Sequence, residues 1–216
     1  MKTRKLGKTG IEVSELVLGG GYVGGLLLQS DEKEKLRAVQ YAMDCGINLI
    51  DTAPSYGNGE SEKAVGKLLP QLTPRPYLAT KVQIDPLIRE DLAGQVEKSI
   101  TASLTRLETS SVDLIQLHNP LGKEDDIKHL GVDHLRGKNG VIKALQKAKD
   151  SGLTKYVGIT ALGNPTSCQI AIETAAFDTV QVYYNMLNPS ADMTVPSNWN
   201  QTNFLNLMTT CEDHKI

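Results

Sequence analysis

The segment INLIDTA, residues 47–53, is a short apolar run that is too continuous for a strand with one face exposed to solvent. Runs of this kind are typical of parallel strands that are buried on both faces of a sheet. Five further apolar runs are spread along the chain, over residues 16–19, 76–81, 112–118, 156–160 and 179–185. The sequence therefore predicts six strands of one parallel sheet.

Stretches with helical periodicity lie between these runs. Apolar residues recur at intervals of three and four, and helices are expected over residues 31–44, 89–107, 140–150, 165–176 and 201–211. Ser30 is expected to cap the first helix. Strands that alternate with helices pair in parallel through right-handed crossovers. The pattern predicts an α/β fold built from parallel βα units, of the βα-barrel type.

Three further expectations concern the rest of the chain. Residues 3–6 and 11–13 are expected to form a β-hairpin before the first barrel strand. Residues 122–138 are polar and charged, and we expect a long loop there. Because no linker composition divides the chain, residues 1–216 are expected to form a single barrel domain that is incomplete at its C-terminal end.

The composition argues against several classes of function. The 216 residues contain 23 Lys and Arg against 25 Asp and Glu, and this near balance argues against a nucleic-acid partner. No apolar run is long enough to cross a bilayer, and no apolar segment follows the basic N-terminus as in a secretory signal. Cys45, Cys168 and Cys211 lie far apart and lack metal-ligand spacing. We expect a cytoplasmic protein with reduced cysteines and no membrane partner.

Ionisable residues end three of the predicted strands. Asp51 follows NLI, Lys81 follows YLAT, and His118 follows LIQL, while Tyr56 lies in the loop just after Asp51. These positions are separated by one βα unit each, so the side chains should project from the same C-terminal edge of neighbouring strands. In a βα barrel, sites are assembled at that edge.

The chemistry of these four groups is complementary. A tyrosine has a pKa of about 10, and a nearby ammonium makes its hydroxyl a better acid by stabilising the phenolate. Lys81 could supply the ammonium, Asp51 its counter-charge, and His118 a hydrogen bond that polarises a carbonyl oxygen. Each residue also has a structural interpretation: a turn, a solvated strand end, a loop aromatic or a core histidine. Their convergence at one edge favours the proton relay.

The flanks of these residues resemble the aldo-keto reductase family. The matching stretches are NLIDTAPSYGNGESEKAVGKLL at 48–69, LATK at 78–81 and VDLIQLHNP at 112–120. The resemblance implies a (β/α)8 barrel of the TIM type, with about six of its eight βα units present. The resemblance implies that Tyr56 donates the proton, that Lys81 and Asp51 tune it, and that His118 positions the substrate carbonyl. It also implies a cofactor site, NADP(H) or NAD(H), at the following residues: Gly21 and Tyr22 under the reactive end, Asp51 at the nicotinamide end, and Thr160 and Gln181 at the carboxamide.

The implied reaction is hydride transfer between nicotinamide and an aldehyde, a ketone or a sugar carbonyl or lactol. GITALG and FDTVQVYYNMLNP resemble the sugar-dehydrogenase-like branch, although Thr160-Ala161 stands where many relatives carry Ser-Asn. A small-molecule carbonyl or sugar is therefore the expected partner. The family's clamp for the rest of the cofactor falls on strands and loops beyond those present, so the sequence leaves open a non-catalytic fragment or binding subunit.

Two other motifs need an interpretation. Gly19, Gly21 and Gly24 form a GxGxxG pattern, the fingerprint of a Rossmann-type dehydrogenase, but the next predicted helix starts late and the pattern leaves Tyr56, Lys81 and His118 unexplained. A loop also carries several metal-ligand side chains, namely Asp125, Asp126, His129, Asp133 and His134. Their spacing matches no known metal motif, and we expect a solvated loop and no metal.

Overall fold

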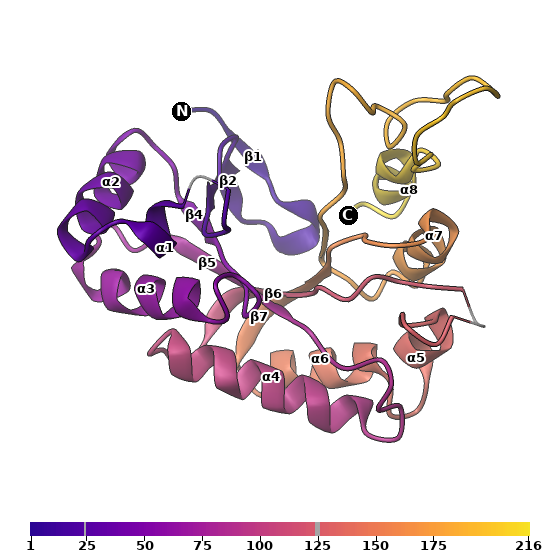
Figure 1. Ribbon diagram of the computed structural model, residues 1–216, viewed down its shortest axis with the longest axis horizontal. Coiled ribbons are helices and arrows are strands. Elements are labelled where there is room, and N and C mark those ends of the chain that lie inside the picture. Colours follow the sequence, from indigo (N-terminus) through magenta and orange to yellow (C-terminus); the bar gives the residue numbers. More distant parts are fainter. Residues whose placement is uncertain (24, 124–125) are drawn as a thin grey trace.

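The computed structural model describes residues 1–23, 25–123 and 126–216. Six parallel strands form one sheet in the order β3-β4-β5-β6-β7-β8. Their bounds are β3 (Leu18–Gly19), β4 (Leu49–Asp51), β5 (Tyr77–Val82), β6 (Val112–Leu117), β7 (Thr154–Ile159) and β8 (Thr179–Val180). The sheet curls into a half barrel with β3 and β8 as its edges (Figure 1). This confirms the six predicted parallel strands.

A hairpin lies beside the start of the barrel strands, as the sequence predicted. Strands β1 (Thr3–Lys5) and β2 (Glu12–Ser14) pair antiparallel. Ile11 and Val13 of the hairpin pack against Leu49, Ala79 and Leu114, which point into the barrel from three neighbouring strands. Asn48 joins the hairpin to β4, since its side-chain amide accepts from Ser14 N at 2.9 Å and donates to Glu12 O at 2.9 Å.

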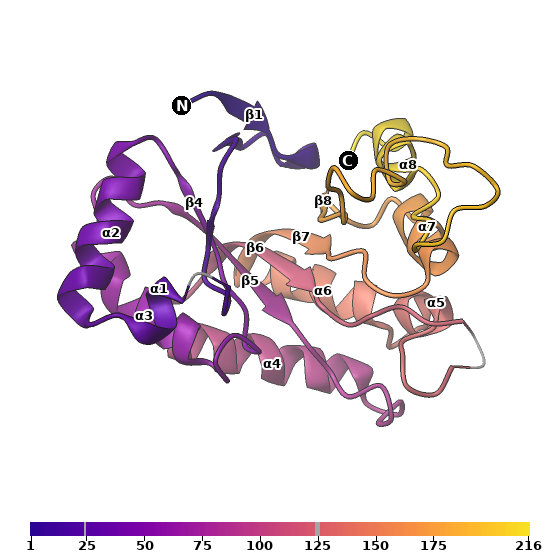
Figure 2. The same ribbon diagram turned by 45° about the horizontal axis from the view of Figure 1, so that its top comes forward.

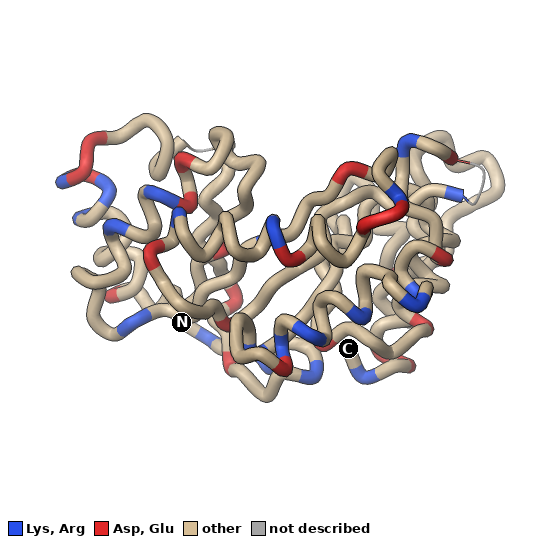
Figure 3. Tube along the Cα trace, turned by 90° about the horizontal axis from the view of Figure 1, so that it is seen from below, with Lys and Arg blue, Asp and Glu red and all other residues tan. Residues whose placement is uncertain are grey.

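Helices cover the outer face of the sheet (Figure 2). They are α1 (Leu26–Gln29), α2 (Glu32–Asp44), α3 (Glu60–Leu68), α4 (Leu92–Arg106), α5 (Val132–Arg136), α6 (Val141–Asp150), α7 (Pro165–Glu173) and α8 (Leu207–Asp213), with 3-10 turns at Gly7–Thr9 and Leu69–Gln71. The main core lies between sheet and helices, where Leu78 and Ile115 meet residues such as Val65, Val96 and Leu145. Basic and acidic residues are mixed along the chain (Figure 3).

The structure corrects two helix starts. Asp31, and not Ser30, caps α2, because its carboxylate accepts a hydrogen bond from Glu34 N at 2.8 Å. Helix α8 begins at Leu207, although the pattern predicted a start at residue 201. Residues before it are held in a loop instead: Ser190 Oγ accepts from Phe204 N at 2.9 Å and donates to Thr202 O at 3.1 Å. Such side-chain bonds to the backbone compete with helix formation.

Three helices were absent from the sequence-based expectations. Helix α1 has 4 residues and lies before the first expected helix. Helix α3 was not predicted, and α5 lies within residues 122–138, which were expected to form a loop throughout. Helix α5 has 5 residues and buries Leu135, so it is too short to show a helical period. Helix α3 follows Gly59, whose positive φ of 89° is favourable for glycine and turns the chain into the helix.

Gly66 sets how closely α3 approaches the end of α4. A Cβ at this position would lie 2.8 Å from Leu107 C and 2.9 Å from Arg106 O. Both neighbours are backbone atoms, which cannot move aside as a flexible side chain could. The two helices therefore depend on glycine at the contact.

We predict that Gly66→Ala destabilises the protein by roughly 1–3 kcal/mol, because overpacking outweighs the gain of about 1 kcal/mol that alanine usually brings in a helix. Urea unfolding followed by circular dichroism measures the change. Gly19→Ala is the matched control, since a Cβ there meets nothing within 4 Å. A Gly66→Ala protein as stable as the wild type would refute the close contact.

Candidate active site

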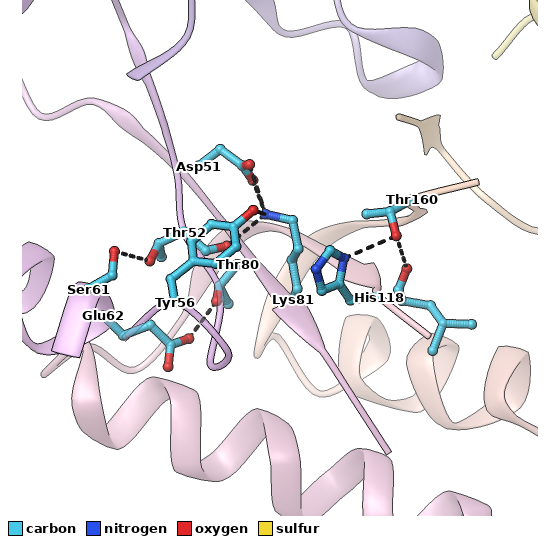
Figure 4. Close-up of polar contacts among 10 residues, drawn as sticks. Asp51, Thr52, Tyr56, Ser61, Glu62, Thr80, Lys81, His118 and Thr160 are labelled. Atoms are coloured by element: carbon cyan, nitrogen blue, oxygen red, sulfur yellow. Dashed lines mark hydrogen bonds and ion pairs between the residues drawn. The ribbon is translucent and has the colours of Figure 1, made fainter. Parts of the chain in front are cut away.

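The sheet brings three of the predicted site residues to one edge. Asp51 is the last residue of β4, Lys81 is the penultimate residue of β5, and His118 directly follows β6. Because these strands are neighbours in parallel register, their side chains meet at the C-terminal edge. Figure 4 shows Tyr56 beside the same cluster, contributed by the loop after β4.

Lys81 is the centre of the cluster. Its side chain is 1 % exposed, and its Nζ lies 2.8 Å from both carboxylate oxygens of Asp51. Nζ also donates to Thr52 O at 2.9 Å and to Tyr56 Oη at 3.3 Å. A buried ammonium is tolerated only when it is paired and hydrogen-bonded, and Lys81 meets both conditions.

The Lys81 contact leaves the Tyr56 hydroxyl proton free. Tyr56 Oη accepts from Lys81 Nζ, which also lies 4.8 Å from the centre of the Tyr56 ring. The hydroxyl can therefore donate its own hydrogen toward a group in front of it. Negative charge that develops on Oη would be stabilised by the adjacent ammonium.

Asp51 is held as the counter-ion in a nearly dry environment. Burial raises the pKa of its carboxyl group above the usual range, and the positive charge of Lys81 opposes that rise. A hydrogen bond from Gln181 acts in the same direction as Lys81. Asp51 therefore depends on Lys81 to remain ionised.

The loop that carries Tyr56 is anchored by buried polar pairs that sequence reasoning missed (Figure 4). Ser61 Oγ lies 2.8 Å from Thr52 Oγ1, next to Asp51. Glu62 is fully buried, accepting from Thr80 Oγ1 at 2.5 Å and from Arg106 Nε at 2.6 Å. Glu62 thus ties α3 to the residue before Lys81 and to the end of α4. The one feature of the sequence that indicates a structural role for Glu62 is its place in the first turn of α3, where an acidic residue is favourable.

His118 is neutral at pH 7 in this environment. Burial, and then the nearby charge of Lys81, lowers the pKa of its imidazole from 6.5 to about 4. Its ring meets the Tyr56 ring edge-on at 6.4 Å. On the other side, Nδ1 lies 3.1 Å from Thr160 Oγ1, so Nδ1 is engaged and Nε2 remains for another partner.

A cavity of about 250 Å³ opens beside these groups. Its walls are formed by Tyr56, His118, Thr160, Leu162, Gln181, Val182, Tyr183 and Tyr184. Thr160 and Gln181, two of the predicted cofactor residues, therefore share one cavity with Tyr56 and His118. The lining combines hydroxyl, amide and imidazole groups with aromatic rings, which suits a small polar ring system.

Gly21 and Tyr22, the remaining predicted cofactor residues, are not among the residues that line the cavity. Gly21 lies beside the Tyr56 ring, where a Cβ would be 3.7 Å from the ring atoms. Tyr22 is 75 % exposed. The GxGxxG pattern extends to Gly24, which lies outside the described residues, but α1 after it has only 4 residues. A Rossmann turn leads directly into a longer helix that binds pyrophosphate.

The candidate metal loop shows no metal geometry in its described part. Asp126 Oδ2 lies 2.6 Å from His129 Nδ1, and His134 Nδ1 accepts from Gly131 N at 3.0 Å. Asp125 lies outside the described residues. Among the residues that the structure describes, no group of three or more His, Cys, Asp or Glu side chains could hold a metal ion.

Comparison with known proteins identifies the family. The model of the Aldo/keto reductase family matches residues 15–215 of this chain. The chain belongs to the aldo/keto reductase family. Its similarity to the Bacillus subtilis aldo-keto reductase YhdN is 39 % identity over 127 residues, covering 56 % of this chain and 38 % of that protein. Its similarity to L-galactose dehydrogenase of Arabidopsis thaliana is 36 % identity over 165 residues, covering 75 % of this chain and 49 % of that protein.

A solved structure confirms the fold of this family member. The putative aldo-keto reductase from Pseudomonas aeruginosa superposes with a TM-score of 0.71 at 28 % identity, covering 99 % of this chain and 74 % of that chain. The predicted barrel type is thereby confirmed. The chain spans about half the length, or less, of the two curated relatives above. Within the described residues, no helix is long and apolar enough to cross a membrane.

The low pKa of His118 makes stability depend on pH. The folded protein takes up this proton near pH 4, whereas the unfolded chain takes it up near 6.5. As pH falls through this window the unfolded state gains the proton first, so stability is lost. We predict that the wild type loses at most about 3 kcal/mol between pH 7 and 4 relative to His118→Asn. Urea unfolding of both proteins at several pH values measures it. Parallel pH profiles would contradict the assignment.

Proposed function

We propose that this protein is a nicotinamide-dependent oxidoreductase that interconverts a carbonyl group and an alcohol, with NADP(H) or NAD(H) as cofactor. One observation carries the proposal: the buried Lys81 ammonium touches both Asp51 and the Tyr56 hydroxyl at the edge of a cavity. A structural ion pair would need no tyrosine hydroxyl at its open side. The arrangement is suited to moving one proton at Tyr56 Oη.

In the reductive direction, Tyr56 Oη donates its proton to the oxygen of the substrate carbonyl. Lys81 compensates the charge left on Oη through the contact at 3.3 Å. Asp51 holds the ammonium in place through the ion pair at 2.8 Å. In the oxidative direction the same oxygen accepts the proton of the alcohol. General acid–base catalysis of this kind contributes roughly 10²–10⁴-fold to the rate.

His118 orients the substrate oxygen if its proton is on Nε2. Thr160 Oγ1 lies 3.1 Å from both His118 Nδ1 and Leu117 O, so its single hydrogen can serve either acceptor. Leu117 O already accepts from Thr160 N at 3.0 Å and stays hydrogen-bonded when the hydroxyl turns away. Thr160 can therefore donate to Nδ1 and leave Nε2–H free to bind the carbonyl oxygen.

The residues of the cavity fit the nicotinamide end of the cofactor. The side-chain amide of Gln181 and the hydroxyl of Thr160 are donors and acceptors that match a carboxamide, and both line the cavity beside Tyr56. Gln181 would hold the carboxamide, with Thr160 beside it, and Gly21, Tyr22 and Asp51 would lie near the reactive ring. A bound nicotinamide supplies the hydride, while the chain's own residues orient the substrate and move the proton.

The proposed substrates are aldehydes, ketones and sugars that react as carbonyls or lactols. The relative from Arabidopsis thaliana is a dehydrogenase of L-galactose, which favours the sugar members of this class. The cavity of about 250 Å³ is lined by both Tyr56 and His118, which supports a small carbonyl or lactol group as the reacting part of the substrate. We further propose a cytoplasmic location, where reduced nicotinamide cofactors are used.

The alternative function is that of a non-catalytic binding protein, which has the barrel fold and does not bind the nicotinamide cofactor. The two functions differ in a measurable way, since only the first requires nicotinamide binding in the cavity.

We predict that Tyr56→Phe lowers kcat for carbonyl reduction by at least about 100-fold, because the proton donor is lost. Oxidation of NADPH, followed by its absorbance with aldehydes, ketones and aldoses as substrates, measures it. The control is Tyr41→Phe, since Tyr41 is 70 % exposed on α2, away from the site. An unchanged kcat in Tyr56→Phe would exclude Tyr56 as the donor.

We also predict that NADPH fluorescence changes on binding, and that Gln181→Ala weakens this binding about 10-fold by removing the carboxamide partner. Gln146→Ala is the control, because Gln146 is exposed and donates to Asp150 on the surface of α6. Tyr56→Phe should bind NADPH like the wild type. Absence of any NADPH binding by the wild-type chain would favour the non-catalytic alternative.

A further inference from the structure

The side chain of Asn119 clamps two barrel strands together beside the candidate active site. Its Oδ1 accepts from Ile84 N at 2.9 Å, and its Nδ2 donates to Ile84 O at 2.7 Å. Asn119 is 4 % exposed and Ile84 is 5 % exposed, so both bonds are buried. Asparagine suits this position because its amide carries an acceptor and a donor, like a backbone peptide group.

The clamp lies where the regular pairing of β5 and β6 stops. The ladder ends at the pair Val82 and Leu117, and the last backbone bond runs from His118 N to Val82 O at 2.8 Å. Asn119 is the next residue, and its side chain adds one more pair of bonds beyond the ladder. The two strand ends that carry Lys81 and His118 are therefore joined past the point where backbone bonds could join them.

Neighbouring contacts fix the other side of the same segment. Leu121 N donates to Leu162 O at 2.8 Å, and Asn164 N donates to Leu121 O at 2.7 Å, which ties the segment to the loop after β7. Pro120 restricts its own φ and disfavours a helical conformation at Asn119. His118 therefore stands between an anchor toward β5, made by Asn119, and an anchor toward β7, made by Thr160 and Leu121.

We infer that Asn119 is a positioning residue for the reaction: by binding the backbone of Ile84, it fixes the His118 imidazole relative to Lys81 and Tyr56. This role rests on the proposed function. Asn119 is not among the residues that line the cavity, and in the part of the chain that the structure describes its side chain hydrogen-bonds Ile84, so it acts through the backbone of His118. A loosened β6 end would move the imidazole away from Tyr56 and let water reach it.

The chain offers a matched control for a clamp without this role. Asn48 makes the same pair of bonds to a backbone, with Ser14 N and Glu12 O, but at the opposite end of the barrel strands. Asn48→Ala and Asn119→Ala both remove two such bonds. Only Asn119→Ala should disturb His118.

The first test is an NMR pH titration of the His118 imidazole in the 216-residue chain. Lys81, Tyr56 and Thr160 are the polar groups that face this ring. In Asn119→Ala we expect the pKa of His118 to rise by at least about 1 unit from its low wild-type value, because the ring is rehydrated. Asn48→Ala should leave it unchanged. An unchanged pKa in Asn119→Ala, with stability reduced as in Asn48→Ala, would overturn the inference.

The second test is kinetic. We expect Asn119→Ala to lower kcat/KM for carbonyl reduction about 10–100-fold, the size of effect that follows small misplacements of catalytic groups. Asn48→Ala should stay within about 2-fold of the wild type, and equal losses in both variants would overturn the inference. If the wild type shows no carbonyl reduction, the proposed function fails, and the titration still decides whether Asn119 positions His118.

A third variant covers the case in which Asn119→Ala does not fold. Asn119→Thr keeps one hydroxyl, which lies one bond closer to the backbone than the amide, so it cannot reproduce the pair of bonds to Ile84 N and O. We expect the pKa of His118 and the value of kcat/KM in Asn119→Thr to lie between those of the wild type and those of Asn119→Ala. If the alanine variant is unfolded, both values in Asn119→Thr should still be shifted from those of the wild type. A folded Asn119→Thr protein with wild-type values in both measurements would refute the positioning role.

Discussion

The structure of the site depends on one buried charge. Lys81 points into the edge of the half barrel with 1 % of its side chain exposed, and it must be neutralised there. Asp51 supplies the opposite charge from the neighbouring strand. Thr52 O and Tyr56 Oη accept further hydrogen bonds from Lys81 Nζ. Because removal of one partner from a buried pair typically costs about 3–5 kcal/mol, the loop with Tyr56 is bound to the fold through this ion pair.

The surrounding polar contacts form a second layer around that charge. Glu62 joins Thr80, the neighbour of Lys81, to Arg106, and Asn119 joins the exit of β5 to the exit of β6. Each contact links elements that are far apart in the sequence and adjacent in the sheet. The positions of Tyr56 and His118 are thereby set by rigid strands and helices, although both residues lie outside the strands themselves.

The sequence could predict the parts that repeat. Six apolar runs indicate six parallel strands, and parallel strands place the ionisable residues at three of their ends, Asp51, Lys81 and His118, at one edge. The sequence could not predict contacts that have no period. The pairing of Glu62 with Arg106 spans 44 residues, and the clamp of Asn119 on Ile84 spans 35. Helix α5 and the loop before α8 were missed for the same reason, since side-chain hydrogen bonds to the backbone shape them.

The burial of Lys81 also has a consequence for handling the protein. Amine-reactive dyes and coupling resins modify lysines that reagents can reach, such as Lys63 with 53 % of its side chain exposed and Lys147 with 72 %. Lys81 is covered by Tyr56, Thr52 and Asp51, and it presents almost no surface to such reagents. Labels or solid supports attached through surface amines would therefore leave the reactive cluster chemically intact.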